Sequence, residues 1–169
     1  MMRGLITGGA GRLGTTVCKA FLRDGLQVRV FDLDTPGNRK SVKEFSTNTE
    51  IMWGDITQPD SVRKALDGVD AVVHMAGILP PVAYEKPELA AKVNIGGTKI
   101  IVDLLKEKSG QIPFVFTSSV AAFGPTPNAT EPLCPEKSVP SPRGAYGETK
   151  LQAENIIKES GIGYVVLRL

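Results

Sequence analysis

Residues 7–14 of the chain read TGGAGRLG, and this stretch decides the fold. An expected strand over residues 5–7 leads into it, and residues 15–23 after it have the apolar spacing of a helix. Glycines between a strand and a helix allow a tight turn, a close approach of a pyrophosphate group and close helix–sheet packing. The N-terminus of the helix adds N–H donors for phosphates. The stretch predicts a dinucleotide-binding βαβ unit, although a glycine-rich turn without a ligand has the same pattern.

Short apolar runs alternate with longer amphipathic segments along the rest of the chain. This alternation predicts an α/β fold, a Rossmann-type doubly wound parallel sheet with helices on both faces. The expected strands are nearly continuous Val, Ile and Phe, as in sheets that are buried on both faces. Strands are expected over residues 5–7, 27–31, 51–53, 70–75, 113–117 and 164–167, and helices over residues 15–23, 58–66, 88–108 and 146–159.

Composition excludes several classes of protein. The 169 residues fit one domain, and 41% hydrophobic with 22% charged residues is an ordinary globular mixture. A net charge of +2 gives no indication of a nucleic-acid partner. Two cysteines and one histidine supply neither a disulfide framework nor a metal site. Without a signal segment or an apolar run of about 18 residues, we expect a cytoplasmic protein with no membrane partner.

Two stretches stand apart from this pattern. Residues 124–143 contain six prolines and are expected to form a long loop of functional or mobile character. The sequence ends at Leu169, inside the last expected strand, and a buried strand is a poor place for a domain to stop. We therefore expect further polypeptide beyond this point.

An acidic residue at the end of the second strand supports the dinucleotide interpretation. Asp32 follows Gly14 by 18 residues, where a carboxylate accepts hydrogen bonds from the adenosine ribose and repels a 2′-phosphate. This favours NAD over NADP. The less favoured alternative for this aspartate is a helix N-cap or a turn residue. Arg12, Arg39 and Lys40 keep NADP open, because each carries a cation that can bind a phosphate.

A tyrosine and a lysine indicate acid–base chemistry. Tyr146 and Lys150 are four residues apart on an expected helix and share one face. A nearby ammonium lowers the pKa of a phenol toward the range of a useful catalyst, although a surface Tyr–Lys pair has the same spacing. The hydroxyls of Thr117, Ser118 and Ser119 follow the fifth strand, at the carboxyl end where ligands bind in such sheets.

These motifs, in this order, resemble those of the extended short-chain dehydrogenase/reductases, the NAD-dependent epimerase/dehydratase group. The resemblance covers essentially the whole chain. Its motifs are TGxxGxxG at 7–14, the acid at 32, Asp-Ile at 55–56, His-Met-Ala-Gly at 74–77, Asn-Ile-Gly-Gly-Thr at 94–98, the serine pair at 118–119 and Tyr-Gly-Glu-Thr-Lys at 146–150.

The resemblance implies a role for each matching residue, with NAD as cofactor and NADP as the less favoured one. It makes Tyr146 the acid–base catalyst, and Ser119, or its neighbour Ser118, the residue that holds the substrate oxygen. Lys150 would hold the nicotinamide ribose and tune Tyr146, and His74 would be structural. The implied cofactor-binding residues are Gly8, Gly11, Arg12, Leu13, Gly14, Asp32, Asp55, Ile56, Met75, Ala76, Gly77, Asn94, Tyr146 and Lys150.

The implied activity is that of an NAD-dependent oxidoreductase or epimerase, which transfers hydride at a secondary alcohol or ketone of a nucleotide sugar or similar small molecule. Dehydratases of the group carry an acid pair where this chain has residues 119–121, Ser-Val-Ala, which cannot transfer the protons. Residues 1–169 would be the NAD(P)-binding domain, without the C-terminal substrate domain, and would dimerise through the long helix and the Tyr–Lys helix. The alternative is a non-catalytic NAD(P)-binding sensor or scaffold protein.

Overall fold

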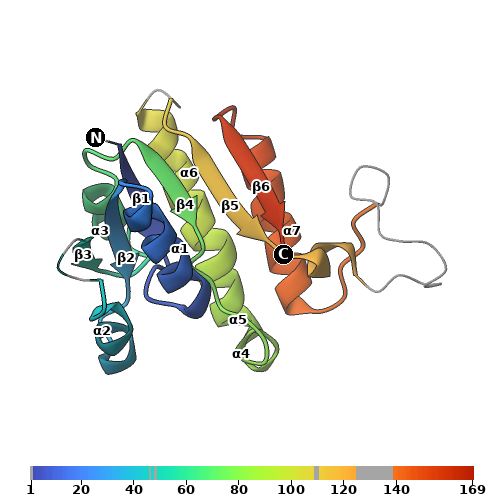
Figure 1. Cartoon of the computed structure of the whole chain (residues 1–169). Coiled ribbons are helices and arrows are strands. Elements are labelled where there is room, and N and C mark those ends of the chain that lie inside the picture. The colour runs from blue at the N-terminus through green and yellow to red at the C-terminus, as the bar shows by residue number, and fades with distance from the viewer. Residues whose placement is uncertain (1, 46, 48, 109–110, 125–138) are drawn as a thin grey trace.

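A six-stranded sheet forms the centre of the computed structural model (Figure 1), which describes residues 2–45, 47, 49–108, 111–124 and 139–169. Its strand order is β3-β2-β1-β4-β5-β6 and every neighbouring pair is parallel. This confirms the predicted Rossmann-type sheet. The strands are β1 Arg3–Thr7, β2 Gln27–Asp32, β3 Thr49–Trp53, β4 Ala71–His74, β5 Phe114–Ser118 and β6 Tyr164–Arg168.

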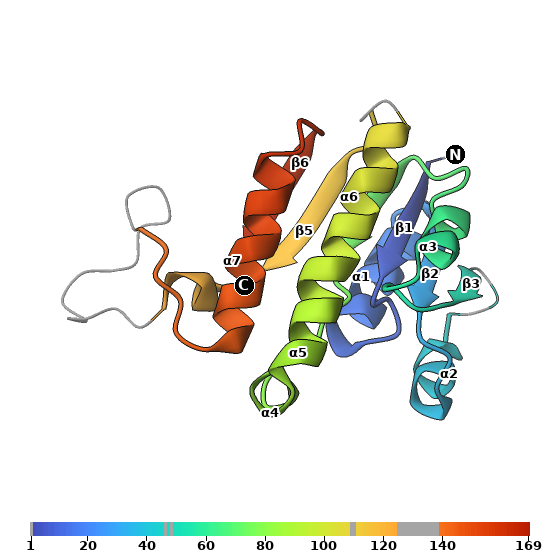
Figure 2. The same ribbon diagram turned by 180° about the vertical axis from the view of Figure 1, so that it is seen from behind.

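Helices cover both faces of this sheet. Helix α1 lies on one face, and α3, α6 and α7 lie on the other (Figures 1 and 2). The helices are α1 Arg12–Arg23, α2 Pro36–Val42, α3 Pro59–Ala65, α4 Val82–Glu85, α5 Pro87–Ala90, α6 Gly97–Glu107 and α7 Ala145–Lys158, with a π-helical segment Ala91–Gly96 and a 3₁₀ turn Val120–Phe123.

The core therefore has two layers, one on each side of the sheet. Successive strand residues point to opposite faces, so the fully buried Leu5 and Ile6 belong to different layers. Ile6 packs with Cys18 of α1, whereas Leu5 belongs to the larger layer that includes Ile101 of α6 and Ile157 of α7.

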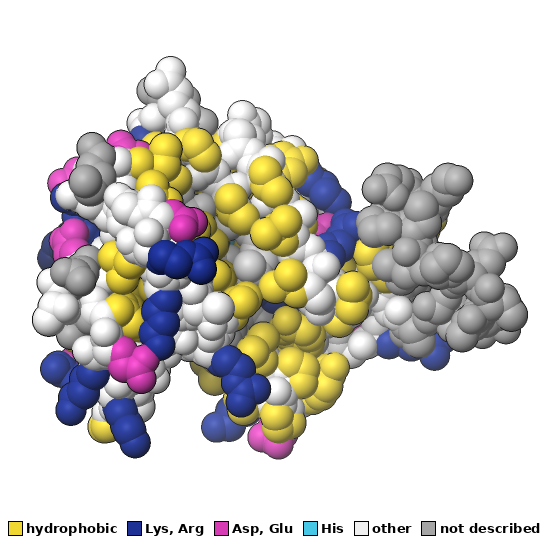
Figure 3. All heavy atoms as spheres, in the orientation of Figure 1, with side chains coloured by type: hydrophobic (Ala, Val, Ile, Leu, Met, Phe, Trp, Pro, Cys, Tyr) yellow, Lys and Arg dark blue, Asp and Glu magenta, His cyan; other side chains and the backbone are white. Residues whose placement is uncertain are grey.

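One part of the α1 face has no helix over it among the described residues. Val73, Val115 and Val165 stand in register across β4, β5 and β6. Val165 is 52% exposed and Leu167 is 45% exposed. Figure 3 shows hydrophobic side chains on this face of the molecule. Parallel sheets are normally covered on both faces, and this strip is uncovered among the described residues.

The sequence missed some helical detail. The helix expected over residues 88–108 is present, but it is built from α5, the π-helical segment and α6 in succession. Helix α2 was not predicted, although Thr35 caps it by accepting from the Asn38 N–H and Pro36 stands in its first turn. Cys134 and most of the proline-rich stretch 124–143 lie outside the described residues. Within the described part of the chain, every helix is too short or too polar to cross a membrane.

A buried histidine joins the ends of β1 and β4 to the helical run behind them. The His74 Nδ1 lies 2.6 Å from the Thr7 hydroxyl, and its Nε2 lies 3.0 Å from the Thr98 hydroxyl. Because Thr98 donates its proton to the Asn94 carbonyl at 2.6 Å, it must accept from His74 Nε2–H. The Nδ1 atom then accepts from Thr7. Both ring nitrogens are satisfied by protein groups.

This environment keeps His74 neutral. Burial, with a smaller contribution from the nearby charge of Lys150, lowers the pKa of its imidazole from 6.5 to about 3. His74 is therefore a structural residue, as the sequence indicated. Below about pH 6.5 the imidazole of His74 is protonated in the unfolded chain but stays neutral in the folded chain. The free energy of unfolding therefore falls as the pH drops from 6.5 toward 3.

We predict that His74 lowers the free energy of unfolding by about 2 kcal/mol between pH 7 and pH 5. The His74→Gln variant, whose amide keeps a donor and an acceptor but does not titrate, should lose this part of the pH dependence. Urea unfolding of both proteins at the two pH values measures it. An equal loss of stability in the variant would show that His74 is protonated inside the fold.

Candidate functional site

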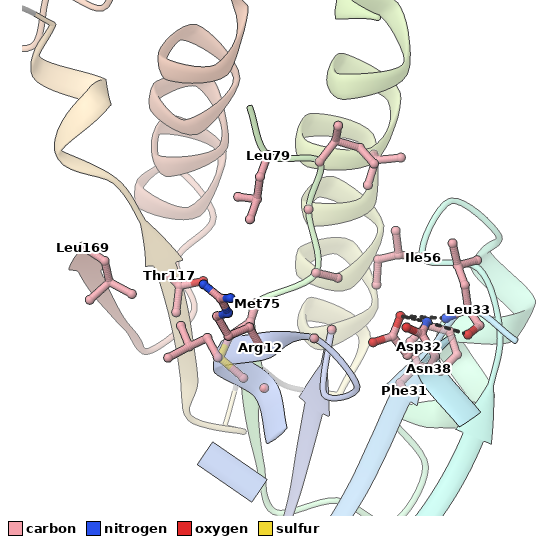
Figure 4. Close-up of a pocket in the computed structure, with 18 of the residues that line it drawn as sticks. Arg12, Phe31, Asp32, Leu33, Asn38, Ile56, Met75, Leu79, Thr117 and Leu169 are labelled. Atoms are coloured by element: carbon pink, nitrogen blue, oxygen red, sulfur yellow. Dashed lines mark hydrogen bonds between the residues drawn. The ribbon is translucent and has the colours of Figure 1, made fainter. Parts of the chain in front are cut away.

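A pocket of about 640 Å³ opens at the carboxyl ends of the strands, where the strand order reverses between β1 and β4 (Figure 4). Ligands bind at such switch points in open α/β sheets. Every predicted site residue except Asn94 lines it. Those residues are Gly8, Gly11, Arg12, Leu13, Gly14, Asp32, Asp55, Ile56, Met75, Ala76, Gly77, Ser119, Tyr146 and Lys150.

The glycine loop fits against its neighbours without room for side chains. Gly8 has φ +70°, and a Cβ on it would lie 2.7 Å from the Ala76 nitrogen. A Cβ on Gly14 would lie 2.2 Å from the Gly8 carbonyl oxygen. Gly11 stands at the N-cap of α1 and offers no side-chain acceptor to the first-turn N–H groups. These N–H groups and the positive end of the helix dipole form a cradle for an anion.

Asp32 lies at the far end of the pocket from β5. One carboxylate oxygen accepts from the Ala10 N–H at 3.0 Å, and the other accepts from the Leu33 N–H at 2.8 Å and the Asn38 amide at 3.1 Å (Figure 4). Burial raises the pKa of this carboxyl group, and the two backbone donors oppose the rise. A carboxylate has about four acceptor positions, so one remains for a further donor. Thr35, not Asp32, caps the following helix.

Arg12, Arg39 and Lys40, the three cations that could bind the 2′-phosphate of NADP, have different surroundings. Arg39 forms a two-pronged ion pair with Asp34, at 2.5 and 2.7 Å, and lies 5.6 Å from the centre of the Trp53 ring. Lys40 lines a second, smaller pocket on the outer side of the glycine loop. Arg12 lines both pockets. Arg12 and Lys40 therefore lie beside the glycine loop, whereas Arg39 is paired with Asp34.

The middle of the pocket is built from the segments after β3 and β4. Ile56 is buried and Asp55 accepts from the Thr57 N–H at 2.8 Å, which shapes the turn after β3. The backbone N–H groups of Met75 and Ala76 each donate to the Thr7 hydroxyl at 3.2 Å. The chain after β4 is therefore fixed to the end of β1.

Asn94 lies behind the pocket wall and supports it. Its amide accepts from the Ile78 N–H at 2.7 Å and donates to the Ile78 carbonyl at 3.1 Å and to the Thr149 hydroxyl at 3.0 Å. A Cβ on Gly77 would lie 3.0 Å from its Oδ1 atom. Asn94 thus ties the segment after β4 to α7 from within the π-helical segment, and in this structure it uses its amide on protein groups.

Ser119, Tyr146 and Lys150 meet at the β5 end of the pocket. The buried Lys150 ammonium donates to the Thr117 carbonyl at 2.9 Å and lies 5.9 Å from the centre of the Tyr146 ring. Ser118 donates its hydroxyl proton to the buried Glu154 at 2.6 Å. Ser119, in contrast, hydrogen-bonds with Tyr146. The geometry therefore favours Ser119 over Ser118 as the hydroxyl that faces a substrate.

The expected lowering of the tyrosine pKa is wrong for this structure. Burial raises the pKa of Tyr146, the hydrogen bond with Ser119 lowers it, and Tyr84 adds a smaller rise. The Lys150 ammonium donates to the Thr117 backbone carbonyl, and burial is the largest influence on the pKa of Tyr146. Burial also lowers the pKa of Lys150 from 10.5 to about 8.

Several residues that line the pocket were not predicted from the sequence. Asn38 belongs to α2, whose Thr35-Pro36 start was an available signal. The apolar wall residues carry no local signal, because any apolar side chain could stand there. The pocket residues not predicted are Thr16, Phe31, Leu33, Asn38, Gly54, Ile78, Leu79, Val93 and Leu169.

We predict that Gly14→Ala lowers the free energy of unfolding by about 1–3 kcal/mol, because the new methyl group meets backbone that must move. Gly96→Ala is the matched control. A Cβ there meets nothing within 4 Å and the backbone is helical, so that change should be neutral or slightly stabilising. Urea unfolding measures both variants, and equal effects would contradict the close packing at Gly14.

Comparisons with known proteins agree with this geometry. Residues 4–169 match the model of the NAD dependent epimerase/dehydratase family. Protein y4nG of Sinorhizobium fredii, which is uncharacterized, is 43% identical over 158 residues, 92% of this chain and 36% of that protein. The 3 beta-hydroxysteroid dehydrogenase type 7 of Mus musculus is 32% identical over 124 residues, 72% of this chain and 33% of the enzyme.

A solved structure shares the fold over nearly the whole chain. The UDP-glucose 4-epimerase of Thermus thermophilus, in complex with NAD, superposes with a TM-score of 0.86 at 27% identity, over 99% of this chain and 54% of the enzyme. The chain thus spans between a third and about half of the length of these relatives. The match of almost every residue to the family model, together with the pocket, shows that the chain belongs to the NAD dependent epimerase/dehydratase family.

Proposed function

We propose that this chain is the cofactor-binding part of an NAD-dependent oxidoreductase or epimerase. The enzyme would transfer hydride at a secondary alcohol or ketone of a small molecule. The observation that carries the proposal is the division of one pocket into two chemical ends. Asp32 and the glycine loop lie at one end, and Ser119, Tyr146 and Lys150 lie at the other.

The residues present fit a dinucleotide. The close approach at Gly8 and Gly14 leaves backbone N–H groups open to a pyrophosphate, and Asp32 has one acceptor position left for a ribose hydroxyl. When bound, NAD supplies the hydride acceptor for the substrate carbon. Lys150, charged below about pH 8, would hold the nicotinamide ribose.

Around the reacting carbon, the chain supplies a proton and an oxygen-binding hydroxyl. Because burial raises the pKa of Tyr146, its phenol is neutral at pH 7 and is ready to give a proton to a substrate carbonyl. Ser119 would hold the same oxygen atom from the side of β5. In the oxidation direction, the phenolate form of Tyr146 would take the proton from the substrate hydroxyl, and the hydride of the same carbon would go to NAD.

The relatives suggest which substrates to consider. The substrate, the location and the oligomeric state are properties of the whole protein. A nucleotide sugar as substrate is supported by the UDP-glucose 4-epimerases among the relatives, and the hydroxysteroid dehydrogenases support other secondary alcohols. A cytoplasmic location and a homodimer through α6 and α7 remain predictions. The exposed side chains on the two helices are polar or charged, and they are Lys99, Asp103, Lys106, Glu107, Glu148, Gln152, Asn155 and Lys158.

We predict that this chain binds NADH with a micromolar Kd and binds NADPH at least about tenfold more weakly, because the Asp32 carboxylate repels a 2′-phosphate. Asp32→Asn should remove most of this discrimination. Fluorescence titrations with both cofactors measure it. Tighter binding of NADPH would overturn the role of Asp32 and point to Arg12 and Lys40.

We predict that Tyr146→Phe abolishes turnover in the protein at its natural full length while NADH affinity changes by no more than a few fold. The phenyl ring keeps the packing of α7 but carries no proton to transfer. Steady-state turnover and NADH titration measure the two effects. Unchanged turnover would refute the mechanism, and tight NADH binding without turnover in the unaltered protein would favour the sensor or scaffold alternative.

A further inference from the structure

One face of α7 carries three polar residues toward the end of β5. Tyr146, Lys150 and Glu154 follow one another at intervals of four residues, so they form one stripe along the helix. The stripe faces residues 117–119, where β5 ends and the 3₁₀ turn begins. The first two members belong to the proposed catalytic group. Glu154 is not among the residues that line the pocket.

Each member of the stripe has a partner at the end of β5. The Lys150 ammonium donates to the Thr117 carbonyl at 2.9 Å. The Ser118 hydroxyl donates to Glu154 Oε1 at 2.6 Å. The neighbouring residue, Ser119, is the partner of the tyrosine. Three consecutive residues of the strand end are therefore held to three positions of one helix, and the register of the helix against the strand is fixed.

Glu154 also receives the end of β6. Its side chain is fully buried, and Arg168 donates to Oε1 at 2.8 Å and to Oε2 at 2.6 Å. Lys158 adds a contact to Oε2 at 3.3 Å. Burial would raise the pKa of the Glu154 carboxyl group, but the hydrogen bonds from Arg168 and Ser118 outweigh it and keep the pKa lower than usual. The Arg168 guanidinium lies 4.4 Å from the centre of the Phe123 ring, which belongs to the 3₁₀ turn.

Glu154 acts on Lys150 through charge as well as through packing. Burial lowers the pKa of Lys150 to about 8, and the Glu154 carboxylate opposes this change. The other titratable groups that face Lys150 are Tyr146 on the same helix and His74 on β4, and both are neutral at pH 7. Among the described residues, Glu154 is thus the anion that supports the ammonium form.

We infer that Glu154 is a positioning residue of the catalytic end, which holds Ser118 and the end of β6 against α7 and places a carboxylate one helical turn from the Lys150 ammonium. This inference rests on the proposed function, in which Lys150 binds the nicotinamide ribose. It assigns the buried ion pair with Arg168 a role in binding and catalysis beyond the stability of the fold.

Three variants separate the charge of Glu154 from its structural contacts. Glu154→Gln removes the charge and keeps the shape. Because it leaves Arg168 without an anion in a largely buried position, which is destabilising in general, the charge-balanced double variant Glu154→Gln/Arg168→Gln accompanies it. Glu148→Gln is the matched control, since Glu148 is an exposed carboxylate on the same helix.

The first measurement needs no ligand. The ammonium group of Lys150 is titrated by NMR through its side-chain nitrogen or ε-carbon. We expect a midpoint near pH 8 in the unaltered chain, a midpoint about one pH unit lower in both Glu154 variants, and no change in Glu148→Gln. One unit corresponds to about a tenfold loss of proton affinity. An unchanged midpoint in the Glu154 variants would overturn the inference.

The second measurement connects the charge to the site. At about pH 8.5 the Glu154 variants should bind NADH about eightfold more weakly than the unaltered chain, and at about pH 6, where Lys150 is protonated in all proteins, the loss should nearly vanish. AMP reaches only the Asp32 end and should bind all variants equally. A loss that is equal at both pH values and shared by AMP would mean a merely structural role. If the unaltered chain binds no NADH, the proposed function fails, and the Lys150 titration alone decides on Glu154.

Discussion

The joint between the end of β1 and the end of β4 is the constraint on which the pocket depends. At this point the sheet reverses its strand order, and the two strand ends must diverge to leave space for a ligand. The Thr7 hydroxyl connects the two strand ends, because it donates to His74 and accepts from the N–H groups of the two residues that follow β4. Gly8 then turns away within van der Waals distance of Ala76. A larger residue at position 8 would therefore displace the glycine loop or the segment after β4.

The site handles its buried polar groups in three different ways. His74 is neutralised by burial and enclosed by hydroxyls, so it contributes geometry without charge. The Asp32 carboxylate is held by the Ala10 N–H and the Asn38 amide. It lies at the end of the pocket farthest from the cations of α7. Lys150 and Glu154 lie one helical turn apart, where the Glu154 carboxylate partly offsets the cost of burying the Lys150 ammonium, while Arg168 and Ser118 stabilise Glu154 itself. The pocket thus has an acidic end and a basic end inside a nearly neutral protein.

Much of the fold and of the site was predictable from local sequence. The glycine stretch 7–14 and the alternation of apolar runs specify the parallel sheet, since both are short-range patterns. Asp32 and Tyr146 were found because strand ends and helical spacing bring them to one edge. The direction of the Tyr146 pKa was not predictable, because it depends on how deeply the ring is buried and on where the Lys150 ammonium points. Glu154 was missed for a similar reason, since its partner Arg168 is distant in sequence and only the β5–β6 pairing brings them together.

The uncovered strip over β5 and β6 gives the two ends of the pocket unequal protection from local opening. The glycine loop stands on β1, between two neighbouring strands and with a core layer on each side. The end of β6 stands at the sheet edge with one face in water, and its backbone and Arg168 are what hold the segment after β5. Opening free energies follow such differences in burial. Fraying of the edge strand would therefore release the end of the pocket that carries Ser119 first and leave the glycine loop folded, so under the proposed function turnover would be lost before cofactor binding.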